Sequence, residues 1–219
     1  AKYKVVRKDV RDLPALIQAI KDHKITTVVH TAGLIGKRVD ESLYTSFAIT
    51  VGGTANVAEA VRLSGVKRLV HISTFGVYDR RLEKSGKINE SFPRNGGGAY
   101  GNFKVAKEMV LDAYSRLHGF ELFMIRPANV YGLGHFWAGS GGGEKMQILV
   151  EGGLVGRLAK VPSSQTMDNE YVYAKDLGDL IDRAARIKKM PKQTIFNCGG
   201  GRMVTYAEML KTTRKVIPG

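Results

Sequence analysis

The chain has 219 residues, 43% of them hydrophobic, which is enough material for a substantial core in one or two domains. The single cysteine, Cys198, excludes a disulfide framework and a multi-cysteine metal cluster, so we expect a cytoplasmic protein. No apolar run approaches the roughly 20 residues that span a bilayer, so we expect that the protein enters no membrane. The formal net charge is +14, but the basic residues are scattered and not interleaved with aromatics, so we expect a solvated basic surface and no nucleic-acid binding.

The first third of the chain alternates short apolar runs with helical patterns. The β-branched run at 26–31 is typical of a strand buried on both faces, and it ends at Ala32-Gly33, where small residues let the backbone turn sharply. A loop is expected after this turn. The remaining pattern predicts strands over 3–6 and 67–72 and helices over 14–23 and 54–64.

The middle of the chain contains a long polar, glycine-rich connection at 80–99, a kind of segment that often carries function. A helix over 104–117 follows, and a strand over 121–126 comes after it. The apolar residues predicted to face inward from this helix are Val105, Met109, Ala113 and Leu117.

The last third begins with a loop-rich segment at 132–156 that becomes more helical over 145–150. Strands are predicted over 171–173 and 194–197, with Asp176 capping a helix between them. Thr205 and Glu208 have the spacing of a capping box, which predicts the start of a final helix.

Strands separated by helices of about ten to fifteen residues imply right-handed crossovers between parallel strands. The predicted fold class is therefore α/β, a doubly wound, mostly parallel, Rossmann-like sheet with helices on both faces. Ligands bind at the carboxyl ends of such strands, so the residues that follow them should converge on one crevice. These residues are Thr31, Ala32, Gly33, Ser73, Thr74, Arg126, Pro127, Ala128 and Asn129.

Tyr100 and Lys104 are four residues apart, which places them one helical turn apart on the same face. A free phenol has a pKa of about 10, and a nearby ammonium favours the phenolate and lowers that pKa. With a hydroxyl at Ser73 or Thr74 from an earlier strand, the pair outlines a proton-transfer site. The alternative for Tyr100 and Lys104 is an incidental pair at an exposed helix start.

No metal site is predicted. His30 and His71 lie on predicted buried strands without a cluster of further ligands, so we interpret them as hydrogen-bonded core histidines.

Several short motifs follow the predicted strands in a fixed order. Residues 73–78 read Ser-Thr-Phe-Gly-Val-Tyr, residues 100–104 have the form Tyr-x-x-x-Lys, and residues 126–132 read Arg-Pro-Ala-Asn-Val-Tyr-Gly. Together with 30–33, 53–56 and 171–177, these stretches resemble the extended short-chain dehydrogenase/reductase family of NAD-dependent epimerases and dehydratases. Tyr-x-x-x-Lys alone is weak support, whereas the motifs in register along nearly the whole chain are specific.

The resemblance implies NAD or NADP as the cofactor and a role for each matching residue. Tyr100 would be the catalytic acid or base, Lys104 would hydrogen-bond the nicotinamide ribose, and Thr74 would hold the substrate hydroxyl or carbonyl. The implied cofactor-binding residues are Asp9, Val10, Thr31, Ala32, Gly33, Thr50, Ser73, Tyr100, Lys104 and Pro127. The implied substrate-binding residues are Thr74, Asn129 and Asn169.

The chain departs from the family pattern at three places that bear on the substrate. Thr50 stands where the family often has Asn, which affects the hydrogen-bond relay behind the lysine. Asn169 stands where sugar-nucleotide enzymes often place Arg against a phosphate, and a neutral amide loses that charge-assisted contact. Phe75-Gly76 replaces the Asp-Glu of the 4,6-dehydratases, which disfavours dehydration.

The family's dinucleotide-binding Gly-x-x-Gly-x-x-Gly follows no predicted strand of this chain. By the resemblance, residues 3–6 correspond to the third strand of the family's sheet, and Asp9 follows it toward the adenine. The first and second strands are then missing, and each backbone group left buried and unpaired costs about 1 to 3 kcal/mol. We therefore expect the chain to be part of a longer protein.

The resemblance also implies an NAD(P)-binding domain over 1–129 and 170–199 and a partial, C-terminal substrate-binding region over 130–169 and 200–219. The implied activity is that of an epimerase or oxidoreductase that transfers hydride at a secondary alcohol carbon of a nucleotide sugar. A homodimer through the helix bearing Tyr100 and its neighbour from Thr54 is expected. Two alternatives stay open, a hydroxysteroid dehydrogenase-like reductase of a non-sugar alcohol and a non-catalytic NAD(P)-binding protein.

Overall fold

The computed structural model describes residues 3–84, 86–132, 141–163 and 166–217. Its larger sheet has four strands in the order β1-β2-β3-β6, and every neighbouring pair is parallel. These strands are β1 Thr27–His30, β2 Arg68–Ile72, β3 Glu121–Pro127 and β6 Ile195–Cys198. The predicted α/β class with a mostly parallel, Rossmann-like sheet is confirmed.

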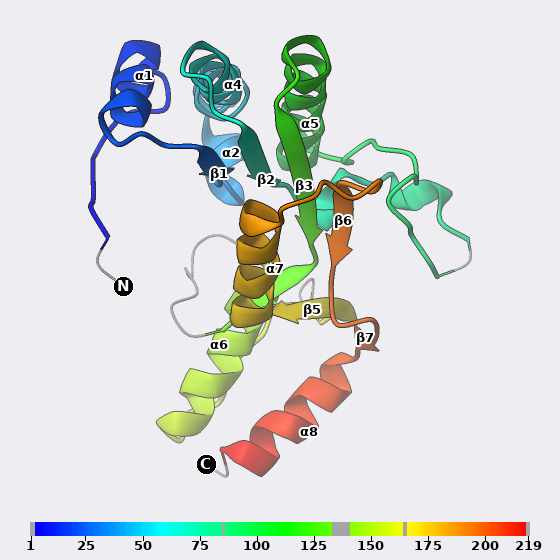
Figure 1. The fold of residues 1–219 in the computed structure, drawn as a ribbon. Coiled ribbons are helices and arrows are strands. Elements are labelled where there is room, and N and C mark those ends of the chain that lie inside the picture. Colours follow the sequence, from blue (N-terminus) through cyan, green and yellow to red (C-terminus); the bar gives the residue numbers. More distant parts are fainter. Residues whose placement is uncertain (1–2, 85, 133–140, 164–165, 218–219) are drawn as a thin grey trace.

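Helices cover both faces of this sheet because successive side chains of a strand point to opposite sides. On β2, Leu69 joins the apolar cluster formed with α4 (Gly53–Leu63) and α5 (Ala99–His118), whereas Val70 joins the cluster that contains α7 (Ala174–Arg186). Figure 1 shows α1 (Leu13–Asp22), α4 and α5 side by side, with α7 apart from them. The sheet is therefore doubly wound.

A smaller sheet lies beyond the carboxyl ends of these strands (Figure 1). It consists of β4 (Asn129–Tyr131), β5 (Asn169–Tyr173) and β7 (Met203–Val204), with β4 and β5 parallel. Its apolar cluster includes Leu149 from α6 (Gly141–Leu154), Tyr171 from β5 and Met209 from α8 (Tyr206–Val216). The capping box of Thr205 and Glu208 at the start of α8 is confirmed. The proposed division into domains stays a prediction.

Residues 3–6 do not form the predicted strand. The side chains of Tyr3 and Val5 are 86% and 69% exposed, and within the described ranges β1 pairs with β2 alone. A strand needs a neighbour for its backbone groups. An apolar run without such a neighbour stays extended and exposed.

The segment between β1 and α4 is helical where a loop was expected. It contains α2 (Lys37–Glu41), α3 (Leu43–Phe47) and a π-helical turn, Ala48–Gly52, which leads directly into α4. The side chain of Ser42 caps α3 by accepting a hydrogen bond from the backbone N–H of Thr45 at 3.3 Å. π-turns are frequent at functional sites, and this one holds Thr50.

The buried face of α5 is also not the predicted one. Met109 is 59% exposed and Leu117 is 77% exposed. The buried residues of the helix are Gly101, Lys104, Lys107, Glu108 and Leu111. In α7, Asp176 lies in the first helical turn, and Tyr173 occupies the capping position.

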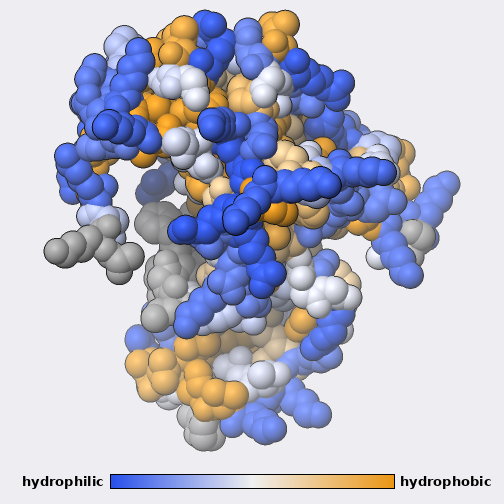
Figure 2. Space-filling model, in the orientation of Figure 1, coloured by the Kyte–Doolittle hydropathy of each residue, from blue (hydrophilic) through white to orange (hydrophobic). Residues whose placement is uncertain are grey.

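The space-filling view shows hydrophilic side chains over much of the visible face, as expected for a solvated basic surface (Figure 2). No helix among the described residues is both long enough and apolar enough to cross a membrane.

Candidate functional site

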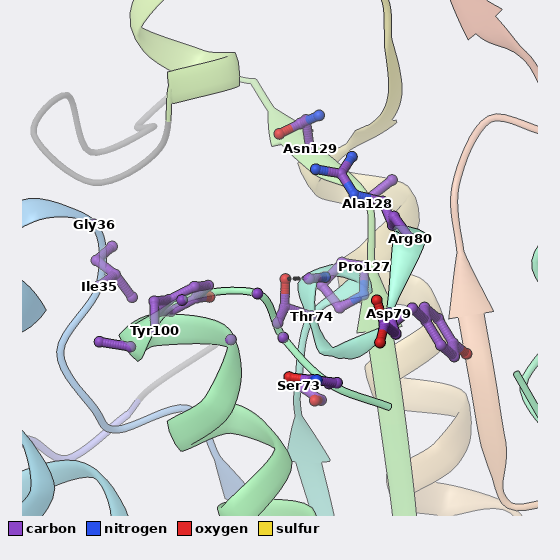
Figure 3. A pocket seen from close by; sticks show the side chains of 18 of the residues that line it. Ile35, Gly36, Ser73, Thr74, Asp79, Arg80, Tyr100, Pro127, Ala128 and Asn129 are labelled. Atoms are coloured by element: carbon purple, nitrogen blue, oxygen red, sulfur yellow. Dashed lines mark hydrogen bonds between the residues drawn. The ribbon is translucent and has the colours of Figure 1, made fainter. Parts of the chain in front are cut away.

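A pocket of about 900 Å³ opens where β2 and β3 end (Figure 3). Its lining includes five residues predicted for cofactor or substrate binding, namely Ser73, Thr74, Tyr100, Pro127 and Asn129. They come from the ends of two parallel strands and from the first turn of α5, and the parallel topology brings these points to one edge of the sheet. The roles of these residues remain predictions.

Thr74 lies at the turn after β2, where its side chain caps the short 3₁₀ helix Phe75–Val77. The backbone N–H of Gly76 donates to Thr74 Oγ1 at 3.1 Å, the bond drawn in Figure 3. The hydroxyl of the preceding residue, Ser73, is buried and makes no hydrogen bond of good geometry within the described ranges, although it interacts with the nearby carboxylate of Glu108. The two hydroxyls therefore differ. The backbone N–H of Gly76 orients the hydroxyl of Thr74, whereas the hydroxyl of Ser73 can still take a further hydrogen-bond partner.

Tyr100 and Lys104 are brought together as the spacing predicted. Lys104 Nζ lies 5.8 Å from the centroid of the Tyr100 ring and donates to the carbonyl oxygen of Ile72 at 3.0 Å. Burial lowers the pKa of Lys104 to about 8, although the charge of Glu108 opposes this change.

Burial raises the pKa of Tyr100, and interaction with the Thr74 side chain opposes this only in part. The expected lowering of this pKa by Lys104 is therefore not found. The ammonium is bonded to a strand carbonyl and lies at the face of the ring, while desolvation of the phenolate dominates.

A second lysine, Lys107, lies behind the turn after β1. Its Nζ donates to the carbonyl oxygen of Ala32 at 2.7 Å, and its side chain is fully buried. Burial, and secondarily the charge of Lys104, lowers the pKa of Lys107 to about 6. The sequence prediction missed this residue because its apolar stripe ran along a different face of α5. The one available signal was that Lys107 falls nearly one turn after Lys104.

The turn itself is closely packed. Gly33 has φ +150, and a Cβ there would lie 3.3 Å from Lys107 Nζ and 3.4 Å from Thr50 Cγ2. Thr50 Oγ1 accepts a hydrogen bond from the backbone N–H of Leu34 at 3.1 Å. Lys107 and Thr50 therefore both hold the backbone that follows β1, whereas Thr31 and Ala32 are exposed in front of them.

The rings of His30 and His71 lie side by side in the core near these lysines, with centroids 5.4 Å apart and planes tilted by 30°. His30 Nε2 lies 2.9 Å from Thr54 Oγ1, as predicted for a hydrogen-bonded core histidine. Within the described ranges neither ring nitrogen of His71 makes a hydrogen bond of good geometry, although the ring interacts with the backbone of His30, so the prediction is not confirmed for His71. Burial lowers the pKa of both rings. In the described ranges, no group of three or more His, Cys, Asp or Glu side chains is placed to hold a metal ion.

A buried ion pair joins α5 to β3. Arg126 Nε and Nη2 donate to the two carboxylate oxygens of Glu108 at 2.9 and 2.7 Å, and Arg94 Nη1 donates to the same carboxylate at 2.8 Å. Arg126 Nη1 also donates to Tyr78 Oη at 2.7 Å. The network holds Tyr78 and Arg94, the two ends of the connection that forms one wall of the pocket. The sequence analysis did not predict a role for Glu108.

Asp9 and Val10 are not among the residues that line the pocket. The carboxylate of Asp9 is exposed and paired with Arg11, whose guanidinium lowers its pKa to about 2. Val10 packs against the start of α4, where a Cβ on Gly53 would lie 2.6 Å from it, and Asn56 Nδ2 donates to its carbonyl oxygen at 3.2 Å. The segment is thus held against α4.

Asn169 makes a direct contact with a pocket residue. Asn129 Nδ2 donates to Asn169 Oδ1 at 3.0 Å and to the carbonyl oxygen of Glu170 at 3.2 Å. The two residues predicted to bind substrate therefore form one uncharged amide pair at the start of the smaller sheet.

The residues at this edge fit the nicotinamide-ribose end of NAD. Lys104 offers a buried ammonium that has further protons to donate beside its bond to Ile72, and Ser73 offers a buried hydroxyl that can take another partner. Gly33 itself carries no side chain, and the Cβ side of its backbone is packed against Lys107 and Thr50.

The doubly wound sheet and the pocket at its strand ends are those of a Rossmann-like protein. A family model described as "NAD dependent epimerase/dehydratase family" matches residues 1–199. The chain belongs to this family.

Individual relatives agree with this assignment. The chain is 32% identical over 186 residues to the UDP-glucose 4-epimerase of Mycolicibacterium smegmatis, a match that covers 84% of the chain and 58% of that relative. It also resembles the structure of Thermus thermophilus UDP-glucose 4-epimerase in complex with NAD, at 27% identity and a TM-score of 0.79, over 97% of this chain and 68% of that one. The fold of Thermotoga maritima UDP-glucose 4-epimerase with UDP-glucose is similar at 21% identity, with a TM-score of 0.82, over 97% of this chain and 68% of that one.

Proposed function

We propose that the protein is an NAD-dependent epimerase or oxidoreductase that acts at a secondary alcohol carbon of a nucleotide sugar. The observation that carries the proposal is the position of Thr74 and Tyr100 in one pocket, with Lys104 buried one turn behind Tyr100. The similarity to UDP-glucose 4-epimerases, one of them crystallised with NAD, supports both the cofactor and the substrate class.

The proposed chemistry divides between the cofactor and the side chains. NAD, when bound, would supply the hydride acceptor for the alcohol carbon, and its reduced form would supply the hydride that an epimerase returns to the ketone. Tyr100 Oη, in its phenolate form, accepts the hydroxyl proton as the carbonyl forms and gives it back in the reverse step; because burial raises the pKa of Tyr100, only a small fraction of the protein carries that phenolate near neutral pH. Thr74 Oγ1 holds the reacting oxygen, and Lys104 holds the ribose.

The side chains after β2 favour hydride transfer over dehydration. Phe75 and Gly76 form the turn next to Thr74, where the 4,6-dehydratases of the resemblance have carboxylates. Without a carboxylate in this turn, no residue there can supply acid or base for the loss of water.

A non-sugar alcohol is the second candidate substrate. The observation in its favour is the uncharged pair Asn129 and Asn169, which offers no charge-assisted contact to a diphosphate. This candidate corresponds to the hydroxysteroid dehydrogenase-like alternative and uses the same Tyr100 and Lys104.

The test begins with the full-length protein as purified from cells. The protein is denatured and the released nucleotide is identified; NAD is expected. The protein is then supplied with NAD and UDP-glucose, and UDP-galactose and NADH are both measured. UDP-galactose without net NADH indicates an epimerase, whereas NADH in proportion to turnover indicates a dehydrogenase. Bound NAD without turnover of UDP-sugars or of an alcohol panel would refute the proposal and favour the non-catalytic alternative.

A homodimer and a cytoplasmic location complete the proposal. The single cysteine supports a reducing compartment, and the exposed apolar residues on α5 support association.

A further inference from the structure

One wall of the pocket carries an arginine that the proposed chemistry does not use. Arg80 begins the 3₁₀ helix Arg80–Leu82 and lines the pocket. Figure 3 shows its side chain on the same side as Asn129 and across from Ile35 and Gly36. Arg80 therefore presents a guanidinium within the substrate space.

The backbone around Arg80 is held in place. The N–H of Arg80 donates to the carbonyl oxygen of Tyr78 at 3.0 Å, and the N–H of Asp79 donates to that of Pro93 at 2.9 Å. Tyr78 is buried, and its phenol donates to Asn197 Oδ1 at 2.7 Å while accepting from Arg126. The position from which the side chain of Arg80 extends is thus fixed before any ligand arrives.

The charges at this wall leave Arg80 uncompensated. Arg81, the next residue, is paired with Asp79, to which its Nε and Nη2 both donate at 2.7 Å. The side chain of Arg80 has no hydrogen-bond or ion-pair partner among the described residues. The other acidic residue of the lining, Asp40, comes from α2, which follows Gly36 on the opposite side of the pocket. The wall that carries Arg80 therefore presents a positive charge to the pocket.

We infer that Arg80 binds an anionic group of the substrate, either a phosphate or a carboxylate. A guanidinium donates two parallel hydrogen bonds to such a group, and the uncharged pair Asn129 and Asn169 beside it can only add neutral contacts. The inference deepens the proposed function and rests on the same pocket.

Calorimetric titration of the full-length, NAD-supplemented protein tests the inference. The probes are inorganic pyrophosphate, UDP, UDP-glucose and UDP-glucuronic acid, and the variants are Arg80→Gln and Arg80→Lys. Loss of a charge-assisted contact weakens binding by about tenfold or more, and Lys recovers part of the affinity because it keeps the charge but not the planar fork. If Arg80 contacts the diphosphate, Arg80→Gln weakens every probe; if it contacts a carboxylate on the sugar, only UDP-glucuronic acid is affected.

The matched control is Arg186→Gln, which removes the same charge from an exposed position on α7 and is expected to change no affinity. Equal affinities of the wild type and Arg80→Gln for every probe overturn the inference, and so does a wild type that binds none of them. A wild type that binds pyrophosphate through Arg80 but converts no nucleotide sugar supports the inference while refuting the proposed function.

Discussion

Lys107 Nζ lies 2.7 Å from the carbonyl oxygen of Ala32, which joins the middle of α5 to the turn after β1 across 75 residues of sequence. The lysine is fully buried, and Thr50 holds the next part of the same turn. The resemblance implies that the cofactor contacts this turn, and we propose that Lys107 positions the turn for it.

Lys107→Met is expected to weaken NAD binding by about tenfold, because it removes the hydrogen bond that holds Ala32. Equilibrium titration with NAD measures the change. Lys188→Met, an exposed lysine just after α7, is the control and should leave the affinity unchanged. Unaltered NAD affinity in Lys107→Met would show that the contact does not position the turn.

The stability of the protein should rise with pH from about neutrality upward. The pKa of Lys107 is lowered to about 6 and that of Lys104 to about 8 in the fold, so the unfolded chain binds more protons than the folded chain between these values and the ordinary pKa of 10.5. Each proton of difference raises the free energy of unfolding by about 1.4 kcal/mol per pH unit. Urea denaturation between about pH 7 and 8 measures this slope. Lys107→Met should lower the slope by the contribution of one proton, about 1.4 kcal/mol per pH unit. An identical slope in the variant would contradict the lowered pKa.

Tyr100→Phe should reduce turnover by at least about a hundredfold, since a phenyl ring cannot move the proton of the reacting alcohol. Circular dichroism and NAD binding should stay unchanged, which separates loss of chemistry from loss of fold. Tyr44→Phe removes a hydroxyl from a side chain that is 87% exposed and serves as the control. Retained activity in Tyr100→Phe would exclude Tyr100 as the acid or base.

Glu108→Gln should destabilise the fold by about 3 to 5 kcal/mol, because it leaves the buried guanidinium of Arg126 without its counter-ion. Urea denaturation measures the loss, and Glu41→Gln, an exposed residue at the end of α2, should have a negligible effect. A loss below about 1 kcal/mol would mean that Arg126 finds other partners.

Met109→Glu should convert a homodimer into a monomer. Met109 and Leu117 form an exposed apolar stripe on α5, the helix through which a dimer was expected from the sequence. Analytical ultracentrifugation of the wild type and the variant measures the change. Met203→Glu on β7, at a similarly exposed methionine, is the control and should keep the dimer. A monomeric wild type would contradict the prediction.

Local sequence determined the elements that depend on neighbouring residues. The apolar runs before Ala32 and Ser73 became β1 and β2, the Tyr100 and Lys104 spacing put both residues on one helical face, and the Thr205 capping box started α8. Periodicity, helical spacing and capping act within a few residues, so they are legible in the sequence. The order of these elements was also sufficient for the fold class, because parallel strands need crossovers of one hand.

Tertiary structure alone decided which surfaces these elements bury. The sequence favoured the apolar stripe of Met109 and Leu117 as the inner face of α5, but the helix buries Lys104, Lys107 and Glu108 instead, because their partners Ile72, Ala32 and Arg126 come from three different strand ends. Hydrogen bonds between residues that lie far apart in the sequence produce no periodic pattern in that sequence. The same reason explains residues 3–6, whose apolar pattern suits a strand but which have no strand beside them among the described residues.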